Sequence, residues 1–241
     1  MTSRDLEIFQ FVFEHRVVCH LQLVGKFFKG SSRSVGHERL SKVTKSGYLI
    51  KSSTYYNGKQ TIFYSLTDKG LKSFSENFRY RITNPSFKSD SISHDFGIVN
   101  VRRRLEKTSM VVEYVSESVL QSCIELIESK KFRAFSILNS DAALVITTEK
   151  DEYQVAFEYE VSDKRESRYG KKLTDYYSSP SVTAVFYVCG NTKIEKLIRQ
   201  TDLEIGQKYE AKVFTCLEET IYRPIDKLPF VNRDNATFYL S

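Results

Sequence analysis

Three carboxylates in the second half of the chain have the residue types and spacing of a divalent-cation site. Asp141 stands immediately before an apolar run at 142–146, and Glu158 and Glu160 lie inside a second apolar run at 155–161. Residues two apart in a strand point to the same face of a sheet, so both glutamates are expected on one face. Carboxylate oxygens are ligands that Mg²⁺ and Mn²⁺ prefer. The pattern therefore predicts a metal site made of Asp141, Glu158 and Glu160.

A metal ion held there would support chemistry on phosphate esters. Such an ion can activate a water molecule and neutralise charge on a phosphoryl group under attack. A nearby lysine can orient the nucleophile or stabilise the transition state. Lys164 follows the second apolar run, with Arg168 and Lys171 further along. We therefore predict that Lys164 completes a catalytic group with the three acids.

A structural role is the alternative for these acids. Asp141 can cap the turn at the start of its strand. A buried Glu158 needs a partner, because an unpaired carboxylate in an apolar strand is costly. That partner is either a metal ion or a basic side chain such as Arg168 or Lys164. Both interpretations stay open on the sequence alone.

The composition narrows the class of protein. The chain has 241 residues, and its apolar fraction of 41% is typical of a folded protein with one large or two small domains. No apolar run approaches the ~20 residues that span a bilayer. We therefore expect a cytoplasmic protein without membrane association. The absence of a C-x-x-C pair and of a glycine-rich nucleotide loop argues against a zinc ribbon and a nucleotide cofactor.

The excess positive charge belongs to the first part of the chain. The formal net charge is +6. Residues 1–90 contain 15 Lys and Arg against 7 Asp and Glu, whereas residues 91–241 contain 21 against 23. Such an asymmetry indicates an anionic partner for the first part, and double-stranded DNA is the partner we predict.

The first ninety residues have the element order of a winged helix. The expected elements are helices at about 3–16, 20–28 and 34–45 and strands at 48–51 and 61–66. Ser3 is the expected first N-cap, and Gly47 ends the third helix. Asn57-Gly58 between the two strands is a strong hairpin signal. In this helix-turn-helix variant the third helix enters the major groove and the hairpin touches the DNA backbone.

Basic side chains on these elements are the candidate DNA contacts. The predicted set is Arg33, His37, Arg39, Lys42, Lys45, Lys51 and Lys59. All can contact phosphates, and Arg33 or Arg39 can also recognise guanine edges. The alternative is that this domain docks proteins or dimerises, with its lysines only solvated.

The rest of the chain predicts a linker and a second domain. Residues 77–93 are rich in Ser, Asn, Arg and Lys and are interpreted as a linker. The elements expected after it are helices at about 94–107, 164–177 and 194–200 and strands at 111–115, 142–146, 154–161, 182–188 and 212–217. This α-β-β-β-α-β order predicts a mixed sheet covered on both faces.

Several stretches resemble a known family. They are Arg4-Asp5-Leu6-Glu7-Ile8-Phe9, Leu66-Thr67-Asp68-Lys69-Gly70, His94-Asp95, Ser140-Asp141-Ala142 and Glu158-Tyr159-Glu160-Val161-Ser162-Asp163-Lys164 with Arg168-Tyr169. The acidic strands are similar to the PD-(D/E)XK nuclease fold of restriction endonucleases. Over about residues 4–190 the chain resembles the replication-relaxation family of mobile elements, which includes plasmid mobilisation proteins.

The resemblance implies an α+β protein with two domains. Residues 1–76 would be a winged helix-turn-helix domain, 77–93 a linker and 94–241 a restriction-endonuclease-like domain with a mixed sheet. It implies DNA nicking or cleavage in replication or mobilisation, with Mg²⁺ or Mn²⁺ as the cofactor. One position departs from the nuclease pattern. Glu160 stands where a lysine is expected, and Lys164 would have to supply that charge.

The resemblance also fits a protein that does not cleave DNA. In that alternative the chain is an accessory or regulatory DNA-binding protein, and an inactive nuclease-like domain serves dimerisation or docking. The partners implied are DNA, a relaxase or replication protein, and a second copy of the chain as a homodimer.

Overall fold

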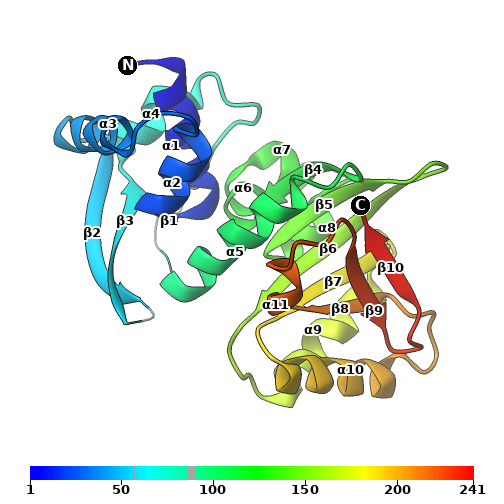
Figure 1. Cartoon of the computed structure of the whole chain (residues 1–241). Helices are drawn as coiled ribbons and strands as arrows, with labels where there is room; N and C mark the ends of the chain where they lie inside the picture. The colour runs from blue at the N-terminus through cyan, green and yellow to red at the C-terminus, as the bar shows by residue number, and fades with distance from the viewer. Residues whose placement is uncertain (57, 86–88, 90) are drawn as a thin grey trace. The chain divides into compact units, whose positions relative to one another are not determined.

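A computed structural model describes residues 1–56, 58–85, 89 and 91–241, without the side chain of Arg33 (Figure 1). The chain divides into two compact units. The first comprises Met1–Asn100 and Gln121–Glu125, and the second comprises Val101–Leu120 and Leu126–Ser241. Asn57 of the predicted turn and residues 86–88 and 90 of the predicted linker lie outside the described residues. The predicted α+β class is confirmed.

The first unit combines helices with a small antiparallel sheet. Its elements are α1 (Ser3–His15), β1 (Val17–Cys19), α2 (His20–Phe27), α3 (Arg33–Lys45), β2 (Leu49–Tyr56), β3 (Lys59–Leu66), α4 (Asp68–Ser75) and the start of α5 (Ile92–Leu105). The three predicted helices and both predicted strands are present. The short strand β1 was not predicted, and it pairs with β3 to give the sheet order β1-β3-β2.

Local chemistry explains where these helices begin and end. Thr2 is the N-cap of α1, and not Ser3 as predicted, because Thr2 and Asp5 form a capping box in which the Asp5 carboxylate accepts a hydrogen bond from Thr2 N at 2.7 Å. After α3 the chain turns at Gly47, whose φ of 78° favours glycine. Gly70 in α4 allows a close approach, since a Cβ there would lie 2.4 Å from the Tyr48 carbonyl oxygen.

The core of the first unit is aromatic and aliphatic. Its fully buried side chains include Ile8, Phe9, Phe13, Leu23, Leu40 and Phe63. Phe9 stacks on Tyr48, with ring centroids 5.3 Å apart. These contacts fix α1 against the segment that leads into the β2–β3 hairpin, so the hairpin and α3 have defined positions.

The second unit is built on a mixed, curled sheet. In the described part of the chain its strands are β4 (Val111–Ser116), β5 (Ala142–Thr147), β6 (Glu152–Glu160), β7 (Ala184–Cys189), β8 (Val213–Leu217), β9 (Leu228–Asn232) and β10 (Thr237–Leu240). The helices along the chain are α6 (Glu117–Ser122), α7 (Ile124–Glu128), α8 (Arg133–Ile137), α9 (Glu166–Ser178), α10 (Thr192–Gly206) and α11 (Glu218–Ile221). The spatial order follows the sequence order, with β6-β7-β8 parallel and the other neighbours antiparallel.

Burial along the strands shows that both faces of this sheet are covered. Consecutive residues are buried in β5, in the second half of β6 and in β7, although they point to opposite faces. Helices α9 and α10 lie side by side along the sheet (Figure 1). None of the helices among the described residues has both the length and the apolar character needed to cross a membrane.

Candidate functional site

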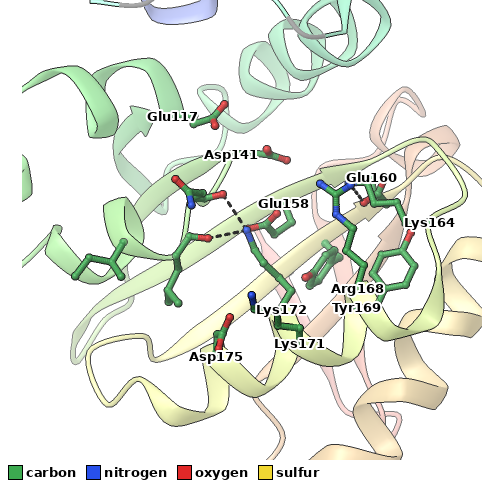
Figure 2. A pocket seen from close by; sticks show the side chains of 14 residues that line it. Glu117, Asp141, Glu158, Glu160, Lys164, Arg168, Tyr169, Lys171, Lys172 and Asp175 are labelled. Carbon is green, nitrogen blue, oxygen red and sulfur yellow. Dashed lines mark hydrogen bonds and ion pairs between the residues drawn. The ribbon is translucent and has the colours of Figure 1, made fainter. Parts of the chain in front are cut away.

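The predicted acids line one cavity of the second unit. In the pairing of β5 with β6, Ala142 lies opposite Phe157, so Asp141 and Glu158 occupy neighbouring positions where the two strands meet the cavity. The cavity has a volume of about 600 Å³. The charged residues that line it are Glu117, Asp141, Glu158, Glu160, Lys164, Arg168, Lys171, Lys172 and Asp175 (Figure 2). The fold thus places the three predicted carboxylates at one cavity, together with Glu117 and Asp175, which were not predicted.

Asp141 immediately precedes β5 and forms hydrogen bonds with two neighbouring elements, β6 and α6. Its Oδ2 accepts a hydrogen bond from the backbone N–H of Tyr159 at 2.7 Å. Its backbone carbonyl accepts another from the N–H of Glu117 at 2.8 Å. The Asp141 carboxylate therefore has a structural contact with β6, and it also lines the cavity. This contact differs from the turn cap considered above, because it joins two strands.

Glu158 is paired with residues of α9. Its side chain is buried, and Oε1 lies 3.1 Å from the Lys172 amino group and accepts a hydrogen bond from the Tyr176 hydroxyl. Lys172 also donates to the carbonyl oxygens of Leu138 at 2.8 Å and Asn139 at 2.9 Å (Figure 2). Lys172 and Tyr176 reach Glu158 together because residues four apart share one face of a helix. The predicted partners Lys164 and Arg168 do not make this contact.

The environment of Glu158 raises its pKa to about 7. Burial is the largest cause, because the ionised carboxylate loses hydration. The positive charge of Lys172 opposes this shift, whereas the nearby negative charge of Asp141 adds to it. Glu158 therefore exchanges its proton near neutral pH, where an ordinary glutamate remains ionised.

Glu160 is held by a different set of partners. It forms an ion pair with Lys164 and accepts hydrogen bonds from the N–H and hydroxyl of Ser162 at 3.4 and 3.3 Å. The predicted catalytic lysine thus neutralises Glu160, four residues before it, and the Glu158 carboxylate is neutralised by Lys172.

The predicted three-carboxylate set does not fit a metal ion in this arrangement. Among the described residues, no group of three or more His, Cys, Asp and Glu side chains could hold one. Asp141, Glu158 and Glu160 each bind groups of the protein instead. The chemistry present is an acid–lysine–tyrosine cluster, and binding of Mg²⁺ or Mn²⁺ stays a prediction.

Lys172 and Tyr176 are the residues that the sequence analysis missed. The signal for them lies in the pattern of α9, whose buried positions include Tyr169, Leu173 and Tyr176. Lys172 is three residues from the first of these and four from the last, so it lies beside the buried face. Lys171, which was considered as a candidate, is exposed and also lines the cavity.

The candidate DNA contacts in the first unit are mostly exposed. His37, Lys42 and Lys45 on α3, and Lys51 and Lys59 on the β2–β3 hairpin, are open to solvent. The side chain of Arg33 lies outside the described residues. These side chains are accessible to a ligand, and their contact with DNA stays a prediction.

Arg39 has a partner within the fold. Arg39 Nε donates a hydrogen bond to Asp5 Oδ1 at 2.7 Å, and Arg39 Nη2 forms an ion pair with Asp5 Oδ2. The Asp5 side chain is fully buried. Burial raises the pKa of Asp5, but the hydrogen bonds from Arg39 and Thr2 outweigh burial and hold the pKa below 3.8. The Arg39 guanidinium therefore fixes α3 to the start of α1.

Comparison with known proteins finds no matching family model, no matching curated protein and no matching solved structure. The family resemblance described above therefore depends on the quoted residues.

The raised pKa of Glu158 predicts how stability depends on pH. The folded protein keeps a proton on Glu158 up to about pH 7, whereas the unfolded chain releases it near 4.5. Folding therefore takes up a proton between these values, and the free energy of unfolding falls as the pH rises through them. The slope for one proton is at most about 1.4 kcal/mol per pH unit. Urea denaturation from pH 5 to 7.5 should show a shallower fall for Glu158→Gln than for the wild type. Equal slopes would contradict this assignment.

Proposed function

We propose that this protein binds double-stranded DNA, and that its first unit is a winged helix that does so through α3 and the β2–β3 hairpin. The order α1-β1-α2-α3-β2-β3 with sheet order β1-β3-β2 supports the winged helix. This arrangement places a helix immediately before a two-stranded hairpin, the two elements that contact the major groove and the backbone in that class.

The main support for this proposal is the excess of basic residues on α3 and on the β2–β3 hairpin. Residues 49–66, which form the hairpin, contain two lysines and no Asp or Glu. Residues 33–45 contain four Lys and Arg, one His and one Glu. Among the described side chains, Lys42, Lys45, Lys51 and Lys59 form no ion pair with a carboxylate, so DNA phosphates are suitable counter-ions for them. Protein docking by this unit has no comparable support.

The second unit supports an accessory role. We propose that it has the nuclease-like scaffold, because α5, β4, β5, β6, α9 and β7 follow one another in the expected α-β-β-β-α-β order. Glu160 and Glu158 are paired with Lys164 and Lys172. Asp141 accepts a hydrogen bond from the backbone N–H of Tyr159. Action in replication or mobilisation, with a relaxase or replication protein as partner, rests on the sequence resemblance, as does a homodimer.

Metal-dependent DNA nicking is the second candidate function, and one observation favours it. Asp141, Glu158 and Lys172 line the same cavity, which is the acid–acid–lysine composition of the nuclease motif with the lysine supplied by α9 instead of Lys164. The ion pairs described above weigh against it, because a cation would have to replace Lys172 beside Glu158.

The DNA-binding function predicts a specific salt dependence. Fluorescence anisotropy with a labelled duplex should show affinity falling steeply between about 50 and about 200 mM salt. The double variant Lys42→Gln, Lys45→Gln should bind more weakly, and its log–log salt slope should decrease by about 0.9 for each phosphate contact removed. Lys196→Gln, Lys208→Gln is the matched control, since both lysines are exposed on the second unit. Equal affinity and slope for both double variants would contradict binding through α3.

The accessory role predicts the outcome of a cleavage assay. Wild-type protein incubated with supercoiled plasmid and Mg²⁺ or Mn²⁺ should leave the plasmid supercoiled, because Asp141, Glu158 and Glu160 are already bound by groups of the protein. Asp141→Asn and Lys172→Met serve as controls for contaminating nucleases. Nicking by the wild type that both substitutions abolish would instead establish the second candidate function.

A further inference from the structure

Side chains from four elements of the first unit meet beside the proposed DNA-binding surface. The rings of His20, at the start of α2, and His37, on α3, contact each other edge-on with centroids 5.5 Å apart. His20 Nδ1 lies 3.3 Å from the hydroxyl of Tyr64 on β3. Lys51 on β2 is close enough for its charge to act on His20. The tertiary fold thus brings together three nitrogen-bearing side chains that are far apart in the sequence.

The charges that His20 experiences in this cluster are positive. The pKa of His20 is lowered below 6.5, first by burial and then by the positive charges of His37 and Lys51. Burial raises the pKa of Tyr64, so its hydroxyl keeps its proton. Among the described residues, the charges that act on His20 are both positive. An anion is the ligand that would relieve this repulsion.

The donors of the cluster are accessible and suit a phosphate. His37 and Lys51 are exposed, and His20 is half-buried. When the Tyr64 hydroxyl donates to Nδ1, the Nε2–H of neutral His20 remains as a donor. When His20 is protonated, both ring nitrogens donate and the hydroxyl accepts. Both protonation states of His20 are therefore compatible with its hydrogen bond to Tyr64.

We propose that His20, His37 and Lys51 form a binding site for a backbone phosphate of duplex DNA, and that this site takes up a proton when the phosphate binds. The inference rests on the proposed DNA-binding function and deepens it. A bound phosphate favours an imidazolium over a neutral imidazole, so DNA and proton bind cooperatively. The affinity for duplex DNA then increases as the pH falls. For one linked proton the increase is at most about tenfold per pH unit.

The test is the affinity of the full chain for a labelled duplex at pH 6 and pH 8, at constant ionic strength. The wild type should bind more tightly at pH 6. Calorimetric titrations in two buffers of different ionisation enthalpy should also show proton uptake on binding. His37→Gln, at an exposed position that does not disturb the core, should weaken binding and reduce both the pH dependence and the proton uptake.

Two controls separate this site from other titrating groups. Glu158 also titrates near neutral pH, but His37→Gln retains it, so an effect confined to this variant belongs to the first unit. Lys42→Gln should weaken binding and leave the pH dependence unchanged. Duplex binding that is equal at pH 6 and pH 8, or a pH dependence unaffected by His37→Gln, overturns the inference and leaves the proposed function intact. Absence of duplex binding at both pH values overturns both.

Discussion

The neutralisation of Glu158 is the interaction on which the arrangement of the second unit's cavity depends. A carboxylate buried in an apolar sheet is unstable without a partner, and the Lys172 amino group supplies one at 3.1 Å. The same amino group binds the carbonyl oxygens of Leu138 and Asn139, and Tyr176 connects Glu158 to Ser140. The Lys172 amino group on α9 therefore connects β6 to the turn before β5, and this turn leads directly into Asp141 at the cavity.

The first unit uses its cations in two ways. Arg39 is committed to the fold through buried Asp5, whereas Lys42 and Lys45 on the same helix are left exposed. The proposed function uses the exposed set. In each unit a buried carboxylate is paired with a cation of the same unit, as Asp5 is with Arg39 and Glu158 with Lys172. Lys42 and Lys45 remain at the surface, where a ligand can reach them.

Elements with strong local signals could be predicted from the sequence, and elements that depend on distant partners could not. The three helices and the hairpin of the first unit were predicted from periodicity, caps and turn residues. β1 was missed because three residues become a strand only through pairing with β3. β9 was missed because it contains Pro229, a residue that argues against a central strand. In the structure Pro229 lies opposite Tyr239 of β10, and the described pairing with β8 involves only Val231 and Asn232. The partners of Glu158 and Arg39 were missed because these partners are distant in the sequence: Lys172 and Tyr176 bind Glu158, and Asp5 binds Arg39.

Hydrogen–deuterium exchange of the full chain, with and without a saturating DNA duplex, tests the central claim most directly. The account predicts slower exchange on DNA binding at the backbone amides of α3 and of the β2–β3 hairpin, with little change in β5 and β6. Protection confined to the second unit, with α3 and the hairpin unaffected, would contradict it.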